Sequence, residues 1–372
     1  MSGRSALGRA LLGALAVALA APLAACSPSG PSSADDALAV LDSSIAAGDR
    51  ERFDTALDRT VPQSTRDMWW SNLGRLSDVD FERTGDGWRV RWSVPGERAV
   101  ATEAVSIATA CAGSVCRITG IGAASGPAPA WLVEPTDVVS VDGAVLIVGR
   151  GAPDLSAAAS VASSAARDAG MSLLTVDPDA PLVLEVPAAD STYALVTGMS
   201  AARTQGLGAL TQREGGAPRI VVNPARAGQS RAGQWSPSQA NMLLTHESVH
   251  WRLSDLGAPV GGNEWVSEGL AEWLGLPRDA DEAAASRARV ARACRDTDGA
   301  PVLPADEQFS STDDADALRD AYALSWAAVD ELVDENGAEA AGALVEQLWT
   351  TPAEQLGGAA DPLPRWCAAN SS

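Results

Sequence analysis

The chain of 372 residues contains only two histidines, His246 and His250, and both lie in the segment His-Glu-Ser-Val-His. Side chains four residues apart lie on the same face of a helix, so both imidazoles can reach one metal ion. Neutral imidazole is a common zinc ligand, and Glu247 is placed to take a proton from an activated water. The spacing therefore predicts a zinc-dependent hydrolytic site; a pair of surface histidines without a metal is the alternative.

The sequence around this segment predicts the helix that such a site requires. Ser236 can cap the N-terminus, and Pro237 suits the first helical position, where a missing N–H costs no hydrogen bond. Apolar residues follow at helical spacing, and Gly257 marks the end. The preceding segment, residues 219–223, reads as a short β-strand, and we expect its exposed edge to pair with an extended peptide.

A catalytic zinc ion needs three protein ligands and one position left for water. Because no third histidine exists, a carboxylate is expected, and Glu268 follows the second histidine by 268 − 250 = 18 positions. It lies in the segment Trp-Val-Ser-Glu-Gly-Leu-Ala-Glu, near the start of a second predicted helix. Glu272, one turn later, can accept the other ring N–H of a zinc-bound histidine and fix its tautomer. Carboxylates that only favour the helix dipole or solvent are the alternative.

HExxH followed by W-x-x-E-G-x-A-E resembles the motifs of the gluzincin metallopeptidases, in particular the broad peptidase MA-like group. The resemblance covers roughly the last third of the chain, at the level of motifs. It implies zinc ligands at His246, His250 and Glu268, a general base at Glu247, and an outer role for Glu272. One catalytic Zn²⁺ ion is the cofactor that it implies.

Members of this group often place a tyrosine or histidine beside the oxyanion that forms during hydrolysis. The chain has two tyrosines, Tyr193 and Tyr322. Tyr322 lies in an apolar helix downstream of the glutamate helix, where the resemblance places such a residue, so it is our candidate oxyanion donor. A core tyrosine is the alternative for Tyr322, and Tyr193 is expected to be structural.

The first 26 residues have the features of an export signal, with two arginines followed by the apolar stretch Leu11–Leu19. They end in Leu-Ala-Ala-Cys, which resembles a bacterial lipobox, so Cys26 is the predicted site of lipidation. A plain signal peptide is the alternative. A flexible tether over residues 27–33 follows. We therefore expect a protein held by its lipid at the outer face of the bacterial cell membrane.

Four further cysteines suggest disulfides, because their number is even and the protein is predicted to be exported. Cys111 and Cys116 flank a turn-like Ala-Gly-Ser-Val, which favours a local bridge and leaves Cys294 to pair with Cys367. All three connectivities remain formally possible. A metal site at the first pair is the alternative, but no further ligands lie nearby in the sequence.

The pattern of apolar residues predicts an α+β fold with two domains. Residues 34–127 read as two or three helices followed by an antiparallel sheet, an order that resembles the NTF2-like cone fold. Residues 123–130 read as a linker rich in glycine and proline. Residues 131–372 form the predicted gluzincin, thermolysin-like domain, with a strand-rich half, a helical half and the metal helix at their junction.

These features predict a zinc-dependent peptidase, lipid-anchored outside the cell, whose partner is a peptide or protein substrate. One alternative is a non-catalytic lipoprotein that binds or docks a partner and carries an inactive metallopeptidase scaffold. Another is the hydrolysis of non-peptide substrates, such as cell-wall amides. The formal net charge of −21 and the pI of 4.4 argue against a nucleic-acid partner, because an acidic surface repels phosphates.

Overall fold

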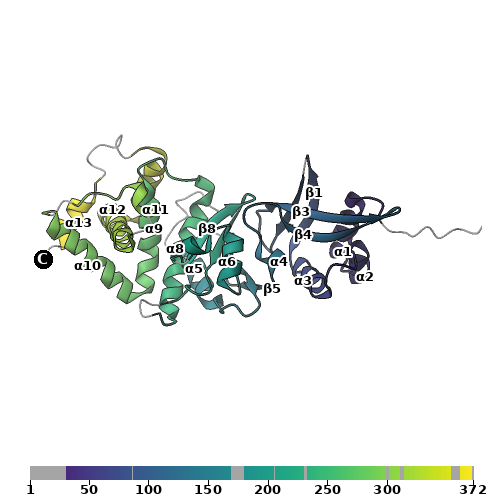
Figure 1. The fold of residues 1–372 in the computed structure, drawn as a ribbon. Helices are drawn as coiled ribbons and strands as arrows, with labels where there is room; N and C mark the ends of the chain where they lie inside the picture. Colours follow the sequence, from purple (N-terminus) through teal and green to yellow (C-terminus); the bar gives the residue numbers. More distant parts are fainter. Residues whose placement is uncertain are drawn as a thin grey trace, which may run out of the picture.

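The computed structural model describes residues 31–85, 87–168, 180–204, 206–229, 233–298, 301–310, 314–352 and 361–370. These ranges contain helices and two sheets, which confirms the predicted α+β class. Figure 1 shows three parts in a row: a helix-and-sheet unit, a central sheet with its helices, and a helical part. None of the described helices is long and apolar enough to cross a membrane. The predicted signal segment and Cys26 lie outside the described residues.

The first unit, as described, places helices before a four-stranded antiparallel sheet in the order β1-β2-β3-β4. Side chains of Ser33 and Asp49 cap the first two helices, and Gly48 between them adopts the left-handed conformation that ends the first. The predicted helices and strands of this unit are therefore confirmed. The elements are α1 (Ala34–Ala47), α2 (Arg50–Ala56), α3 (Gln63–Leu73), β1 (Ser77–Thr84), β2 (Gly87–Ser93), β3 (Ala101–Ala112) and β4 (Val115–Ala123).

The second sheet has five strands within the described ranges, in the order β5-β6-β7-β9-β8. β6, β7 and β9 run parallel, whereas β5 and β8 lie antiparallel at the two edges. The expectation of an exposed edge at residues 219–223 is therefore wrong, because β9 is paired on both sides and β8 covers it. The strands are β5 (Thr136–Val141), β6 (Ala144–Gly149), β7 (Leu182–Val186), β8 (Ala209–Glu214) and β9 (Ala217–Val222).

Helices cover both faces of this sheet. One face packs against α5 (Ser156–Asp168) and α8 (Pro237–Leu253) through an apolar cluster. The opposite face packs against α4 (Ala130–Val133), α6 (Asp190–Thr197) and the first unit, in one continuous apolar core. The two units therefore share a core across the segment that the sequence suggested as a linker. The short helix α7 (Ala201–Thr204) precedes β8.

Polar contacts fix the same junction. Asn72 of α3 donates to the carbonyl oxygens of Trp131 and Glu134, each at 2.7 Å. Arg219 of β9 pairs with Glu97 of the first unit, and the two side chains are only 3% and 4% exposed. The Arg219 guanidinium also lies 4.7 Å from the centre of the Trp92 ring. These contacts add to the shared apolar core that joins the two units.

The variant Glu97→Gln should destabilise the protein, because it leaves the buried charge of Arg219 without its partner. Loss of one partner from such a pair costs about 3 kcal/mol. Unfolding in urea, followed by tryptophan fluorescence, should show a lower midpoint. Adding Arg219→Met should recover much of the loss, because an apolar pair avoids the cost of burying charge. An unchanged midpoint in the single variant would contradict this account.

The helical part is built around α9 (Glu264–Gly275) and α12 (Ala315–Thr350), which pack in one apolar cluster. Gly269 permits their close approach, since a Cβ atom there would lie 2.4 Å from the carbonyl oxygen of Ser325. The remaining elements of this part are the 3₁₀ turns η2 (Ser254–Leu256) and η3 (Leu276–Arg278), α10 (Ala280–Asp296), α11 (Asp306–Ser310) and α13 (Leu363–Asn370).

Two disulfides occur within the described residues. Cys111–Cys116 closes the hairpin of β3 and β4, and Cys294–Cys367 joins α10 to α13. These are the pairings that the sequence favoured, so the structure gives no support to a metal site at the first pair. The second bridge holds the C-terminal helix against the helical part.

Candidate metal centre

The helix α8 presents both histidines on one side. Its N-terminus is the predicted one, because the Ser236 side chain accepts a hydrogen bond from the backbone N–H of Gln239 and Pro237 is the first helical residue. The helix ends at Leu253, and Gly257 has positive φ after the following 3₁₀ turn.

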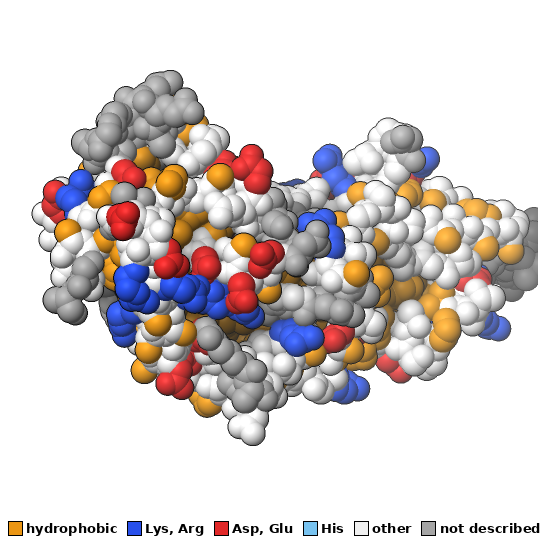
Figure 2. Space-filling view, turned by 60° about the vertical axis from the view of Figure 1, so that its left-hand side comes forward, with side chains coloured by type: hydrophobic (Ala, Val, Ile, Leu, Met, Phe, Trp, Pro, Cys, Tyr) orange, Lys and Arg blue, Asp and Glu red, His pale blue; other side chains and the backbone are white. Residues whose placement is uncertain are grey.

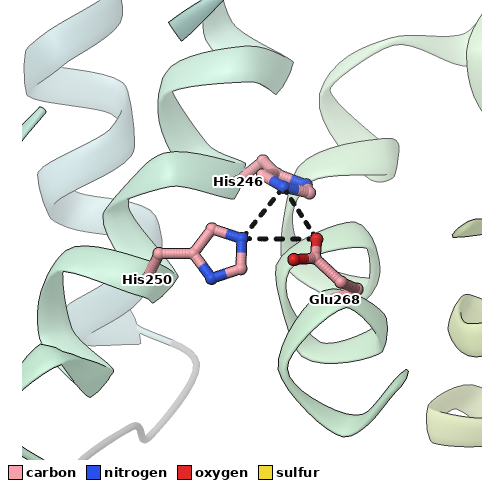
Figure 3. Close-up of side chains that lie close together, drawn as sticks. All are labelled: His246, His250 and Glu268. Carbon is pink, nitrogen blue, oxygen red and sulfur yellow. Dashed lines mark hydrogen bonds and ion pairs between the residues drawn. The ribbon is translucent and has the colours of Figure 1, made fainter. Parts of the chain in front are cut away.

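His246, His250 and Glu268 converge between α8 and α9 (Figure 3). The two Nε2 atoms are 3.1 Å apart, and each lies 3.4 Å from Glu268 Oε2. Bonds of about 2.1 Å at tetrahedral angles place the ligands of zinc about 3.4 Å apart. Glu268 Oε2 is buried and has no hydrogen-bond partner among the described residues. The three side chains could therefore hold one metal ion, and their spacing fits zinc.

Each histidine ring is held through its other nitrogen. His246 Nδ1 lies 3.1 Å from Glu272 Oε1, and His250 Nδ1 lies 3.2 Å from Ser267 Oγ. An N–H at Nδ1 leaves the lone pair of Nε2 free for a metal. Glu272 thus lies where the sequence predicted. Ser267 was not predicted, although it directly precedes the proposed carboxylate ligand.

Burial and charge oppose each other at this centre. Burial disfavours the protonated form of His246, but the nearby carboxylates of Glu268 and Glu272 raise its pKa well above the usual value. Burial alone would raise the pKa of Glu268, but the two neighbouring histidines hold it well below its usual range. A carboxylate that stays ionised, in a pocket that favours positive charge, suits a cation.

Glu247 is held by the edge strand β8. The Thr211 hydroxyl donates to Glu247 Oε2 at 2.7 Å. Thr211 pairs with Ile220, whose side chain belongs to the apolar cluster under α8, so this face of β8 is the one that meets the helix. The hydrogen bond fixes one carboxylate oxygen and leaves the other for a water molecule. Thr211 was missed because it lies 36 residues away in sequence, with no motif linking it to the helix.

Tyr322 reaches the centre from α12. Its ring lies edge-to-face with His246, with 6.0 Å between the ring centres. Burial raises the pKa of Tyr322 well above its usual value, and nearby carboxylates, Glu268 first, add to the shift. The phenol therefore stays protonated and can donate a hydrogen bond. Tyr193, in contrast, is fully buried in the core that the two units share.

The start of α9 is fixed by α11. The carboxylate of Asp306 accepts hydrogen bonds from the backbone N–H groups of Gly262 and Glu264, at 2.7 and 3.0 Å. A carboxylate here satisfies N–H groups that the helix leaves unpaired and complements its dipole. It therefore holds the first turn of α9, and Glu268 follows one turn later.

Cavities border the centre on two sides. One, of ≈ 360 Å³, is lined by His250, Glu268, Glu264 and Asp306; we name it the acidic cavity. Another, of ≈ 430 Å³, reaches Glu272 and Tyr322. The centre can therefore be reached from either side.

No protein-family model matches the chain, and no curated protein matches it. The resemblance to gluzincins thus rests on the two sequence motifs, and the functional assignment must come from the geometry of the centre.

Proposed function

We propose that the protein is a zinc-dependent peptidase of the gluzincin type. The observation that carries this proposal is the triangle of His246, His250 and Glu268, whose sides of 3.1, 3.4 and 3.4 Å suit three ligands of one zinc ion. Glu247 and Tyr322 border the triangle and supply the acid–base and hydrogen-bonding groups that hydrolysis requires.

The residues around the triangle suggest how a peptide bond would be cleaved. Zinc bound there would activate a water molecule and polarise the substrate carbonyl. Glu247, oriented by Thr211, takes the proton of that water and then delivers it to the leaving amine. Tyr322 donates a hydrogen bond to the carbonyl oxygen as negative charge develops. The tautomers of the histidines are kept by Glu272 and Ser267.

The edge of the central sheet supports a peptide as the substrate. β8 has no strand partner on its outer side among the described residues. It runs beside α8, where Thr211 contacts Glu247 and Arg213 donates to the carbonyl oxygen of Ser254. An extended chain can add to such an edge through main-chain hydrogen bonds. A peptide bound in this way would lie beside the strand whose Thr211 contacts the proposed general base.

The finer assignments of fold and location are part of the same proposal. The order of helices and four antiparallel strands supports an NTF2-like first unit. A mixed sheet followed by helices, with the metal helix between them, supports a thermolysin-like second unit. A lipid on Cys26 would hold the enzyme at the outer face of the cell membrane.

The test of this proposal is the metal content of the purified chain together with its hydrolysis of peptides. We expect about one zinc ion per chain by elemental analysis. Cleavage in a peptide library should be lost on chelation and restored by zinc. A parallel panel of cell-wall amides separates the peptidase from the alternative hydrolase. A chain that holds no zinc and cleaves no peptide would favour the binding lipoprotein instead.

A further inference from the structure

Arginine side chains gather around the cavity that reaches Glu272 and Tyr322. Its lining includes Arg226 from the loop before α8, Arg289 of α10 and Arg319 of α12, together with the carboxylates of Glu272 and Glu282; we name it the arginine cavity. Figure 2 shows basic side chains in a band, flanked by acidic ones, on the helical part of the molecule. The chain has a net charge of −21, so three guanidinium groups around one cavity need an explanation.

Part of this charge is structural. Arg289 lies between Asp316 and Asp320, at 3.0 and 2.6 Å, and these pairs tie α10 to α12. Arg319 pairs with Asp316 at 3.2 Å, but more than half of its side chain is exposed. Arg226 differs, because its exposed guanidinium has no acidic partner among the described residues. It is therefore available to a ligand.

The arginine cavity lies at one end of the contact between β8 and α8. The two elements run in the same direction, since Gly208 approaches Leu243 near their starts and Arg213 bonds Ser254 near their ends. Gly208 and Leu243 line the arginine cavity, whereas Ser254 lines the acidic cavity. The cavities at the two ends of this contact thus differ in charge, and the described lining of the acidic cavity contains no arginine.

We infer that the arginine cavity binds a carboxylate of the substrate, either an acidic side chain or the C-terminus of a peptide; this rests on the proposed peptidase function. The planar guanidinium presents paired N–H donors that match a carboxylate. A peptide paired antiparallel with β8, the more stable arrangement, runs toward Gly208 and the arginine cavity. The carboxylate therefore belongs on the C-terminal side of the cleaved bond.

Four small probes test the inference without turnover. Each carries a zinc-binding hydroxamate followed by Leu-Glu or Leu-Gln, with the C-terminus either free or amidated. Binding to the zinc-loaded full-length protein is measured by calorimetry. We expect a probe with a carboxylate in the cavity to bind about tenfold more tightly than the neutral Leu-Gln amide. Comparing the Leu-Glu amide with the Leu-Gln acid shows which carboxylate the cavity takes.

Variants separate the arginine cavity from the metal centre. The double variant Arg226→Gln, Arg319→Gln should lose the tenfold preference and keep its affinity for the neutral amide. Arg287→Gln, on α10 but outside the lining, is the matched control and should keep the preference. Equal binding of all four probes to the wild type would overturn this inference alone. No binding of any probe would overturn the zinc site and this inference with it.

Discussion

Glu247→Gln is expected to bind zinc as tightly as the wild type and to lose about 10³-fold in kcat. The amide has the same shape as the carboxylate, and its oxygen can still accept the hydrogen bond of Thr211. It cannot take a proton, so water is no longer deprotonated during attack. Zinc content by elemental analysis and kcat on a cleaved peptide, measured on one preparation, check both parts.

The control for this variant is Glu346→Gln, the same chemical change at an exposed position of α12. It should leave both zinc content and kcat unchanged. Loss of zinc in Glu247→Gln would mean that the glutamate supports the metal rather than the proton transfer. Full activity in that variant would remove Glu247 from the mechanism.

The candidate metal centre could be predicted from the sequence because its pattern is local. His246 and His250 lie four residues apart on a helix whose N-terminal cap can be recognised in the sequence. Glu268 and Glu272 lie four residues apart on the next helix. Helical geometry puts each pair on one face. The sequence did not predict how α8 packs against α9, and this packing brings the four side chains together.

The parts that the sequence did not reveal depend on long-range packing. β8 contains Thr211, Gln212 and Arg213 in sequence, so it lacks an apolar run, and the neighbouring β9 was mistaken for the edge. The glycine- and proline-rich composition of residues 123–130 suggested a linker, but part of this segment is packed at the junction of the two units. Ala128 and Ala130 are buried there, and Glu185 accepts the backbone N–H of Ala130. Small residues that suggest a loose linker also suit close packing.

Glu268→Ala is expected to lower zinc affinity by at least about 10³-fold, because it removes one of three ligands and the only charged one. Competition against a zinc indicator of known affinity measures the loss. Glu272→Gln is the matched comparison on the same helix: it keeps all three ligands and removes only the carboxylate beside His246. Loss of such an outer partner costs about 10- to 100-fold.

Proton release distinguishes loss of a ligand from general damage to the site. Carboxylate partners raise the pKa of His246 well above its usual value, so the metal-free protein carries a proton there at pH 7. Zinc must displace that proton, and zinc affinity should fall as the pH falls. Glu268→Ala removes one of those partners, which lowers the pKa of His246, so fewer protons should leave on binding. Calorimetry in buffers of different ionisation enthalpy counts them. Unchanged affinity and unchanged proton release in Glu268→Ala would show that this carboxylate is no ligand. The three-ligand zinc site on which the enzyme proposal rests would then be contradicted.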